Sequence, residues 1–402
     1  MKKRVLIFSL AWFPFESGAE NAPRIVADRL SDEYEFDVIA YRFKRNWLIV
    51  EKVGNATVYR VGRPVPHKTA LCGTGSSVGV YFWRWNERFA KYGYIFWGFI
   101  KAVQLHSKNP YDLTWSIMAG YTGGIAYWFK VFNPKVPLLL TLQEGDPFEH
   151  IMRRAGITKY WFRDLFNKVD AVHAISNYLA DFSKQMGFRG TPVVVPNGVD
   201  VEKFSNPLGS LAYKWMLRDK KQIILINTSR LVHKNAHDII IRALKLLPEN
   251  VVYKNVAQHG DLQDELLELA RKEGVSHRVF LLPGLPHDKI AEWLHTGDIL
   301  VRPSRTEGLG TSFIEAMAAG LPIVATPVGG IPDFLINEVT GLFAEVDNPE
   351  SVAECIKRLI NDSNLREKII KNAEELAKKE YDWKVVASKL KKVIDDTIPK
   401  TV

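Results

Sequence analysis

Two glutamates, Glu307 and Glu315, lie eight positions apart in the stretch RTEGLGTSFIEAMAAGLP at residues 305–322. On one continuous helix this separation would place them ~12 Å apart along the axis and ~80° around it. Carboxylate pairs that hydrolyse a bond flank it at only ~5 to 9.5 Å. The spacing therefore favours two glutamates that bind different parts of one elongated ligand, each accepting hydrogen bonds from separate hydroxyl groups. A loop glutamate and a helix glutamate that both face solvent remain an equal alternative.

The residues between the two glutamates are suited to bind a phosphate or a hydroxyl group. Gly308 and Gly310, on either side of Leu309, permit close approach of the backbone to a ligand. Thr311 and Ser312 suit the first turn of the helix TSFIEAMAAG. We expect a cradle here, formed by the turn and the start of the helix.

Two further turns carry residues that suit phosphate binding. In TSRLVHKNAHD, Arg230 and Lys234 follow a strand-like run, where two cations could converge on a diphosphate. An ordinary pair of solvated basic residues is the alternative. In SGAE, Gly18 would let the backbone approach a phosphate, although a plain turn between a strand and a helix explains one glycine equally well.

Polar residues end another strand-like run, in TLQEGDPFEH. Gln143, Glu144 and Asp146 are candidates for an acceptor or sugar pocket there, with loop solvation as the alternative. His173 in DAVHAIS is expected to be a buried strand histidine. The sequence has no Asp-x-Asp where a diphosphate and a cation would need it and no His/Cys constellation, so no metal ion and no other cofactor is expected.

The elements that must position these residues alternate between short apolar runs and amphipathic helix-length segments, twice over. This pattern predicts an α/β protein with two doubly wound domains of five strands each. The strand-like runs are RVLIFSL, FDVIAY, DLTWSIM, VPLLLTL and DAVHAI in the first half and QIILINTS, VVYKNV, RVFLLP, DILVRPS and LPIVAT in the second. We place the first domain at residues 1–197, the second at 198–383, and a terminal helix at 384–402 that packs back on the first. In such sheets ligands bind beyond the carboxyl ends of the strands.

Composition narrows the partners and the setting. The 402 residues carry 54 Lys and Arg against 45 Asp and Glu, a net charge of +9 that favours anionic partners. The first residues resemble a signal peptide, but a buried first strand fits better because a turn and a helix-like stretch follow. Cys72 and Cys355 have no metal-type spacing, which suits a reducing cytosol. No run reaches the ~20 apolar residues of a membrane span.

Aromatic and basic residues are mixed at residues 80–108 and 41–50, with little acid. This mixture suits an anionic membrane interface, and packing of aromatic rings inside the domain explains it equally well. No motif for nucleic acid supports that class of partner.

Most of the chain resembles the retaining family-4 glycosyltransferases of GT-B architecture, in which two Rossmann-like domains face each other across a cleft. The motifs that carry the resemblance follow one another in order: GAE, AIS, VPNGVD, SRLVHK, PSRTEGLGTSFIEAMAAGLPIVATPVGG and YDW. The long motif with its Glu-x7-Glu spacing is highly specific, and the others are individually weak.

The resemblance implies a role for each motif residue. Glu315 would bind the ribose hydroxyls of a nucleotide-sugar donor, and Glu307 with the backbone at 308–310 would hold the sugar ring. Arg230 and Lys234 would neutralise the diphosphate leaving group, assisted by the amides near Thr311 and Ser312. The donor would then need no metal ion, because cations and a helix amino terminus stabilise the departing nucleotide.

The sequence departs from the family pattern at three positions. Ser17 precedes Gly18 where many members have two glycines, Gln143 stands where many have histidine, and Asn235 follows Lys234 in place of a glycine. We expect the last change to alter the turn more than the charge. The amide contact of Ser17 with phosphate and the role of Gln143 stay open.

The function that these motifs predict is transfer of a sugar from a nucleoside diphosphate, UDP or GDP, to a lipid-linked or polysaccharide acceptor bound by the first domain. The expected setting is the cytoplasm, with peripheral attachment to the inner face of the cytoplasmic membrane as an option. Two alternatives stay open: a nucleotide-sugar 2-epimerase of the same fold, and a nucleotide-sugar-binding subunit without turnover.

Overall fold

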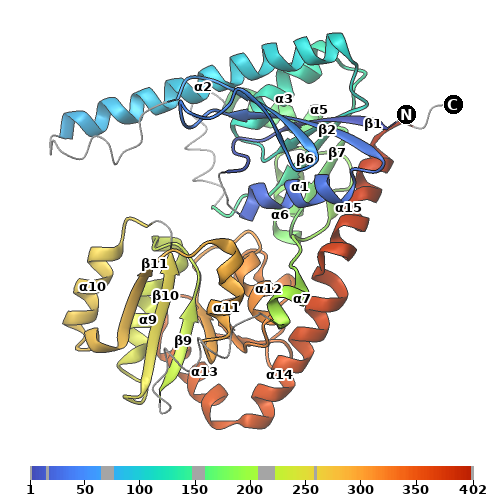
Figure 1. Ribbon diagram of the computed structural model, residues 1–402. Coiled ribbons are helices and arrows are strands. Elements are labelled where there is room, and N and C mark those ends of the chain that lie inside the picture. Colours follow the sequence, from blue (N-terminus) through green and yellow to red (C-terminus); the bar gives the residue numbers. More distant parts are fainter. Residues whose placement is uncertain are drawn as a thin grey trace. The chain divides into compact units, whose positions relative to one another are not determined.

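The computed structural model describes residues 2–14, 18–64, 77–146, 159–206, 222–257 and 260–399. The chain divides into two compact units, one made of Met1–Val195 with Ala387–Val402 and the other of Pro196–Val386 (Figure 1). These borders lie close to those expected from the sequence. Each unit contains a mainly parallel sheet with helices around it, which confirms the predicted fold class.

The first unit is built on an eight-stranded sheet in the order β3-β4-β2-β1-β5-β6-β7-β8. All neighbours pair in parallel except β3, which runs antiparallel to β4. Every residue of β5 and β6 is buried, as expected for central parallel strands covered on both faces. The strands are β1 (Lys3–Phe8), β2 (Tyr34–Tyr41), β3 (Val50–Val53), β4 (Ala56–Val61), β5 (Leu113–Ile117), β6 (Leu138–Leu142), β7 (Ala171–Ala174) and β8 (Val193–Val194).

The helices of the first unit follow the strands in sequence. They are α1 (Gly18–Arg29), α2 (Ser77–Lys108), α3 (Tyr121–Phe132), α5 (Lys159–Lys168) and α6 (Asn177–Gln185). No helix within the described parts of the chain is long and apolar enough to cross a membrane.

The second unit is built on a six-stranded parallel sheet in the order β11-β10-β9-β12-β13-β14. The strands are β9 (Ile223–Asn227), β10 (Val251–Ala257), β11 (Val279–Pro283), β12 (Ile299–Arg302), β13 (Ile323–Ala325) and β14 (Leu342–Phe343). The α-helices are α7 (Val201–Ser205), α9 (His237–Leu244), α10 (Gln263–Lys272), α11 (Ile290–Leu294), α12 (Thr311–Ala318), α13 (Pro349–Asn361) and α14 (Ser363–Leu376).

Short 3₁₀ turns and one π-helical turn complete the second unit. The 3₁₀ turns are η3 (His233–Asn235), η4 (Ser276–Arg278), η5 (His287–Lys289) and η6 (Ile331–Asp333), and the π-helical turn is η7 (Ala377–Tyr381).

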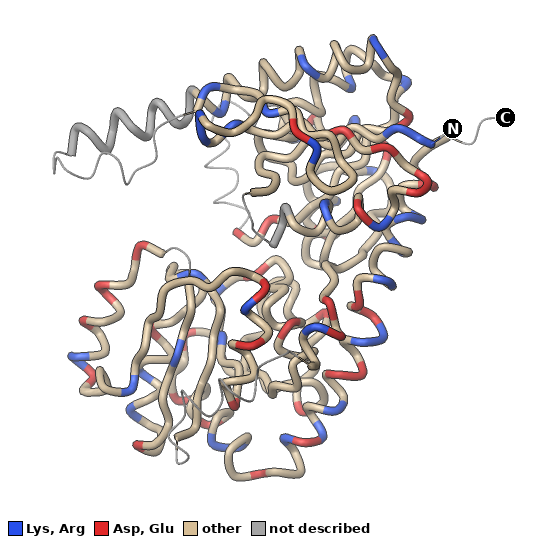
Figure 2. Tube along the Cα trace, viewed as in Figure 1, with Lys and Arg blue, Asp and Glu red and all other residues tan. Residues whose placement is uncertain are grey.

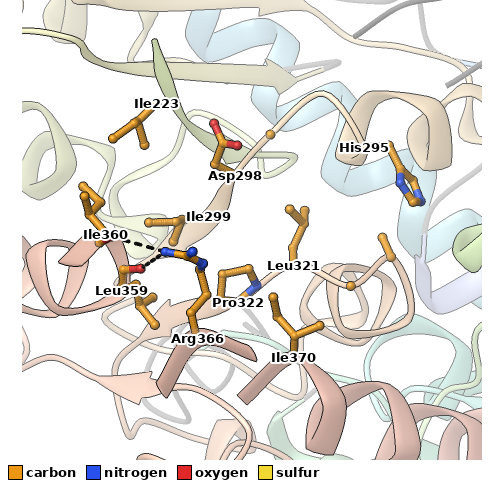
Figure 3. Close-up of a pocket in the computed structure, with 13 residues that line it drawn as sticks. Ile223, His295, Asp298, Ile299, Leu321, Pro322, Leu359, Ile360, Arg366 and Ile370 are labelled. Atoms are coloured by element: carbon orange, nitrogen blue, oxygen red, sulfur yellow. Dashed lines mark hydrogen bonds between the residues drawn. The ribbon is translucent and has the colours of Figure 1, made fainter. Parts of the chain in front are cut away.

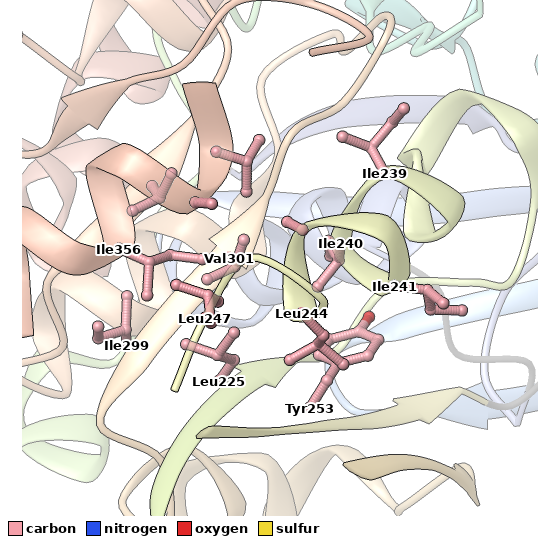
Figure 4. Packing of buried hydrophobic residues seen from close by; sticks show 14 of the residues in the cluster. Leu225, Ile239, Ile240, Ile241, Leu244, Leu247, Tyr253, Ile299, Val301 and Ile356 are labelled. Atoms are coloured by element: carbon pink, nitrogen blue, oxygen red, sulfur yellow. The ribbon is translucent and has the colours of Figure 1, made fainter. Parts of the chain in front are cut away.

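An apolar core holds α9 and α13 against the second sheet (Figure 4). Leu225 on β9 and Val301 on β12 contribute from the sheet, and Ile240 and Ile356 contribute from the two helices. All four side chains are fully buried. This packing fixes the strands whose carboxyl ends carry the motif residues.

The motifs PNGVD and YDW, far apart in the sequence, meet in the second unit. Val199 and Asp382 form a parallel bridge, and the amide of Trp383 donates to the carbonyl of Val199 at 3.1 Å. A Cβ on Gly198 would lie 2.6 Å from the Trp383 ring, so only glycine fits there without a shift. Two motifs that are individually weak therefore form one structural joint.

The terminal helix α15 (Trp383–Thr397) starts in the second unit and continues in the first. In the first unit, Asp395 accepts hydrogen bonds from Tyr34 at 2.6 Å and Lys3 at 3.1 Å, and Lys391 pairs with Glu33 at 3.0 Å. These contacts anchor its carboxy-terminal half to the edge where β1 and β2 begin.

The sequence predicted five strands in each domain, and that number is wrong for both. All ten predicted runs form strands, including the first, RVLIF, in β1. The strands that were missed are β3 and β4, which form a two-stranded hairpin at one edge, and the two-residue strands β8 and β14. Their residues alternate in burial or are too few to form an apolar run, so they lack the signal of a buried parallel strand.

Candidate functional site

The glycine-rich segment between β12 and α12 has a backbone that is held from two sides. Gly310 has a φ of 84° and directly precedes α12, which begins at Thr311. From the other side, the turn after β13 closes on this segment. A Cβ on Gly329 would lie 1.8 Å from the carbonyl oxygen of Glu307, and the amide of Gly330 donates to that oxygen at 3.1 Å. The position of the Glu307 backbone is therefore fixed by contacts.

Glu307 is buried at the end of the second sheet, with 7% of its surface exposed. Its Oε1 accepts from the amide of Gly308 at 3.1 Å, and its Oε2 accepts from the guanidinium of Arg302. Arg302 closes β12 and also donates from Nη1 to the hydroxyl of Ser312 at 2.7 Å. The structure thus brings three predicted residues, Glu307, Gly308 and Ser312, together around an arginine to which the sequence gave no role.

Glu315 lies on α12 and is also buried, with 8% exposed. His287 in η5, just after β11, contacts Glu315 with 3.1 Å between Nε2 and Oε1. The ring of Phe204 meets the His287 ring edge-on at 6.4 Å between centroids. Since Glu307 and Glu315 are both buried and both hold a basic partner, the alternative in which they face solvent is wrong.

Arg230 and Lys234 lie in the connection between β9 and α9. The side chain of Arg230 is exposed and that of Lys234, in η3, is partly buried. The backbone of this connection is well held: Asn235 Nδ2 donates to the Arg230 carbonyl at 2.7 Å, and the Arg305 amide donates to the Lys234 carbonyl at 2.8 Å. Asn235, which replaces the usual glycine, therefore shapes the turn through its side chain.

His237, the first residue of α9, braces the same connection. Its Nε2 donates to the Arg230 carbonyl at 2.9 Å, and its Nδ1 accepts from the Tyr253 hydroxyl at 2.6 Å. Burial lowers the pKa of His237 to about 4, so the imidazole is neutral at neutral pH. The charge offered to a ligand at this turn is thus that of Arg230 and Lys234.

Buried polar atoms without a hydrogen-bond partner among the described residues gather near the carboxyl ends of β9, β10 and β12. They are the Thr228 hydroxyl, the Asn255 side-chain amide, Arg302 Nε and the Ser304 hydroxyl. Most buried polar groups in native proteins are satisfied, so such a group of atoms indicates a place for ligand atoms or ordered water. This is the edge where parallel α/β sheets bind ligands.

The pocket candidates in the first unit, Gln143, Glu144 and Asp146, directly follow β6. Glu144 uses both carboxylate oxygens for the backbone, since Oε1 accepts from the Ala119 amide at 2.8 Å and Oε2 from the Gln143 amide at 2.9 Å. Burial raises the pKa of the Glu144 carboxyl, and the amide hydrogen bonds oppose this rise. Gln143 is buried and Asp146 is partly buried. Glu144 therefore joins the ends of β5 and β6.

His173 and Gly18 are the remaining residues of the first unit about which the sequence made a prediction. His173 is buried, its Nε2 donates to the Val195 carbonyl at 2.7 Å, and burial lowers its pKa to about 4. This confirms the expected buried strand histidine. Gly18 is the first residue of α1, whereas Ser17 and residues 147–158 lie outside the described residues.

A cavity of about 370 Å³ in the second unit is a different place (Figure 3). Ile223, Asp298 and Pro322 line it, and they stand at the amino ends of β9, β12 and β13. Glu307, Gly308 and Ser312 follow the carboxyl end of β12, at the opposite edge of the sheet, so this cavity is separate from the candidate site.

In the described parts of the chain, no three His, Cys, Asp or Glu residues are grouped so that they could hold a metal ion. The positive groups at the site are instead the side chains of Arg302, Arg230, Lys234 and the amino end of α12.

Sequence reasoning missed Arg302, His237 and His287, and for Asn235 it expected an altered turn without naming a partner. Arg302 left one signal, because a lone arginine closes the apolar run DILVRPS directly before the long motif. His237 and His287 gave none, since Tyr253 and Glu315, which they contact, lie on other elements.

Both halves of the chain are similar to known glycosyltransferase families. The model of Glycosyltransferase Family 4 matches residues 17–203, and the model of Glycosyl transferases group 1 matches residues 214–376. An uncharacterized glycosyltransferase of Methanocaldococcus jannaschii is 33% identical over 170 residues, which cover 42% of this chain and 43% of that protein. The chain thus spans less than half of that relative.

Two further proteins are similar over a longer stretch. A GDP-mannose-dependent monoacylated alpha-(1-6)-phosphatidylinositol monomannoside mannosyltransferase of Corynebacterium glutamicum is 28% identical, covering 66% of this chain and 75% of its own. The crystal structure of Anabaena HepE in complex with UDP and glucose has a TM-score of 0.76 at 20% identity, covering 98% of this chain and 100% of HepE. The two halves match the two models in order, and nearly the whole chain shares the fold of HepE. Each half of the chain is therefore similar to a glycosyltransferase family, and nearly the whole chain has the two-domain GT-B fold.

Proposed function

We propose that this protein is a retaining glycosyltransferase of the cytoplasm that moves a sugar from a nucleoside diphosphate to a lipid-linked or polysaccharide acceptor, without a metal ion or another cofactor. The observation that carries the proposal is the pair of buried motif glutamates, each held by a basic side chain at the carboxyl edge of the second sheet. UDP in the HepE structure and GDP-mannose in the name of the Corynebacterium relative support these two nucleotides as candidates.

The donor binds along the edge of the second sheet. Glu315 accepts hydrogen bonds from the ribose hydroxyls, and Glu307 with the amides of 308–310 holds the sugar. A carboxylate has about four lone-pair positions, so Glu307 keeps acceptor capacity beyond its bonds to Arg302 and Gly308. In this proposal the ribose end of the donor lies at Glu315 and the sugar end lies at Glu307.

The leaving group is stabilised by charge. Arg230 and Lys234 face the diphosphate, and the amides at Thr311 and Ser312 add the positive end of the α12 dipole. The acceptor oxygen attacks the anomeric carbon from the face that the nucleotide leaves, so the configuration is retained. The bond from carbon to phosphate oxygen breaks, its electron pair goes with the nucleoside diphosphate, and the acceptor proton passes to that phosphate. No protein nucleophile is required.

The first unit supplies the acceptor side. Gly18 at the start of α1 approaches the donor phosphate, and Gln143 and Asp146 contribute to the acceptor or sugar pocket. Glu144 acts there through the backbone that it braces. Nucleic acid has no part in this proposal.

A thermal-shift screen of UDP-glucose, UDP-N-acetylglucosamine, GDP-mannose and ADP-glucose, each with a chelator, tests donor binding. A donor present at about 100 times its dissociation constant stabilises the folded protein by about 2.7 kcal/mol, so one nucleotide should raise the melting temperature clearly. If none raises it at millimolar concentration, the proposal is contradicted.

Product analysis with the stabilising donor separates the proposal from its rivals. A transferase needs an acceptor for full turnover and keeps the configuration of the sugar. Formation of a 2-epimer without acceptor identifies an epimerase, and binding without any turnover identifies a binding subunit. A rate abolished by the chelator contradicts the metal-independent mechanism.

Exposed aromatic rings on α2 and α3 support a lipid-linked acceptor, because such a surface suits contact with a membrane. Phe96 and Trp97 on α2 and Phe132 on α3 are 57%, 54% and 66% exposed. The ring of Phe99 lies 5.3 Å from that of Phe132, which joins the two helices into one aromatic face. Exposed aromatic rings beside lysine are typical of proteins that lie on an anionic bilayer.

Charge on these helices fits an anionic surface as well. Residues 90–108 of α2 and all of α3 contain lysines and no Asp or Glu, and Figure 2 shows the described part of α2 without acidic positions. Tyr94 packs inside the unit, as the packing alternative expects, whereas Phe96 and Trp97 are exposed and could contact a membrane. In the second stretch, Leu48 and Ile49 are exposed too.

Co-sedimentation with phosphatidylglycerol or phosphatidylcholine vesicles tests this surface. We expect binding to the anionic vesicles that weakens with salt, and loss of binding in a Trp97→Ser/Phe132→Ser variant. Phe280→Ser removes an exposed ring from the second unit and serves as the control. Equal binding by the double variant and the wild type removes this surface from the proposal.

A further inference from the structure

Arg302 connects three parts of the candidate site that are separate in the sequence. Its guanidinium donates from Nη1 to the Ser312 hydroxyl at 2.7 Å, and from Nη2 to Asn235 Oδ1 at 3.3 Å and to the carboxylate of Glu307. The group also lies over the ring of Phe313, 5.0 Å from its centroid. Only 8% of Arg302 is exposed.

Asn235 extends this network to the turn that carries Arg230. While its Oδ1 accepts from Arg302, its Nδ2 donates to the Arg230 carbonyl at 2.7 Å. His237 donates to the same carbonyl at 2.9 Å. One guanidinium is therefore linked to the Glu307 carboxylate, to the first turn of α12 and to the turn after β9.

The positive charge of Arg302 also neutralises the carboxylate of Glu307. A buried carboxylate without a partner would be costly and would repel the phosphates of a donor, whereas the pair of Arg302 and Glu307 is neutral. The guanidinium also orients Glu307, because it holds Oε2 while the amide of Gly308 holds Oε1. The carboxylate thus keeps one rotamer before any ligand arrives.

We propose that Arg302 is the positioning residue of this site: it holds Glu307, the start of α12 and the Arg230 turn in the arrangement that binds the sugar diphosphate. The inference rests on the proposed function, because it assigns Glu307 and Arg230 to the donor. Lysine cannot replace this role in full, since a single ammonium lacks the planar fork that reaches several acceptors at once.

A plain stabilising role is the competing explanation, and the chain offers a matched control for it. Arg278 is also buried in the second unit, and its Nε and Nη2 donate to the carbonyls of Val251 and Pro248, each at 2.8 Å. These carbonyls stand at the amino end of β10, the edge opposite to Glu307. Arg278→Met therefore removes a buried arginine without touching the site.

The experiment compares Arg302→Met, Arg302→Lys and Arg278→Met with the wild type. The probes are UDP against UDP-glucose and GDP against GDP-mannose, with affinity and kcat and KM for donor turnover as readouts. We expect Arg302→Met to lower kcat/KM by about 100-fold, because misplacing reactive groups by about 1 Å has an effect of this size. Affinity for the sugar nucleotide should fall more than affinity for the nucleotide alone, and Arg302→Lys should recover part of the loss.

Arg278→Met should lower the melting temperature and leave kcat/KM within a factor of about two, since it lies away from the site. The double variant Arg302→Met/Glu307→Gln should be no worse than the poorer single variant, because both changes break one unit. Equal kinetics of Arg302→Met and Arg278→Met, or fully additive losses in the double variant, would overturn the inference. If Arg302→Met does not fold, Ser312→Ala deletes one of its hydrogen bonds and should lower kcat/KM with only a small change in melting temperature.

Glu307→Gln separates the two proposals. If the wild type neither binds nor turns over any sugar nucleotide, the proposed function fails. If Glu307→Gln binds and turns over the donor like the wild type, the donor role of Glu307 fails while the transferase activity stands. If Glu307→Gln is defective while Arg302→Met behaves normally, only the role of Arg302 fails.

Discussion

A buried carboxylate beside a buried guanidinium changes how Glu307 can be tested. Removing its carboxylate leaves Arg302 charged and uncompensated, which typically costs about 3–5 kcal/mol. We therefore expect Glu307→Ala to lose both transfer and stability. Glu307→Gln keeps an acceptor oxygen for Arg302 and should lose transfer with a much smaller change in the free energy of unfolding.

Urea unfolding and transfer assays on the two variants check this difference. A Glu307→Ala variant as stable as the wild type would show that the guanidinium finds another partner.

Arg230 should behave in the opposite way, because its side chain is exposed. Arg230→Ala should lower kcat by about 100- to 1000-fold, the usual effect of removing one group that stabilises developing charge. Its melting temperature should stay close to that of the wild type, since only the Arg230 carbonyl takes part in the turn.

A steady-state assay with the identified donor, together with a melting curve, measures both quantities. Exposed Arg189 in the first unit, changed to alanine, is a control for loss of one positive charge. Full activity of Arg230→Ala would remove it from the leaving-group site.

The start of α12 depends on the turn after β13, and Gly329 tests that element. Gly329 has a φ of 56°, and an added Cβ would meet the backbone of Glu307 at 1.8 Å. Gly274 has a φ of 76° but open space around its Cβ position. Gly274→Ala should cost only the left-handed strain of about 1–2 kcal/mol, and Gly329→Ala should cost that plus the backbone shift of about 1–3 kcal/mol.

Chemical unfolding gives the two costs, and donor affinity gives their effect on the site. Only Gly329→Ala should weaken donor binding, because only it displaces Glu307. If both variants lose the same stability and bind donor equally, the close approach of Gly329 to Glu307 contributes neither to the free energy of unfolding nor to donor affinity.

Elements differ in how well the sequence predicted them. Long buried runs such as LLLTL in β6 gave strands directly, since central parallel strands are apolar throughout. The hairpin of β3 and β4 was missed because ATVYRV alternates in burial at the sheet edge. In α2, the sequence showed aromatic residues but not which of them packs inward.

At the scale of the molecule, each unit contains a neutral buried histidine, His173 in the first and His237 in the second. Burial lowers the pKa of each to about 4, below the ordinary value of about 6.5 in an unfolded chain. Between these values the unfolded chain binds a proton that the folded unit does not. Stability is therefore fully present above about pH 6.5 and falls as the pH drops towards 4, by on the order of 3 kcal/mol per histidine.

Unfolding free energies measured between pH 7 and pH 5 check this dependence in a range where most carboxylates stay ionised. His173→Asn and His237→Asn should each flatten the slope, because asparagine does not titrate. A slope that is unchanged in both variants would show that other groups cause it.

By itself, the sequence determined the α/β fold class and predicted the class of the protein and the positions that carry its chemistry. Apolar runs and the Glu-x7-Glu spacing are local patterns, so one chain is enough to read them. The tertiary structure decided which side chains hold the two glutamates, because Arg302 reaches Glu307 from the end of β12 and His287 reaches Glu315 from the turn after β11. Parallel strands bring their carboxyl ends to one edge whatever their separation in the chain, and a hydrogen bond formed there leaves no spacing to read in the sequence.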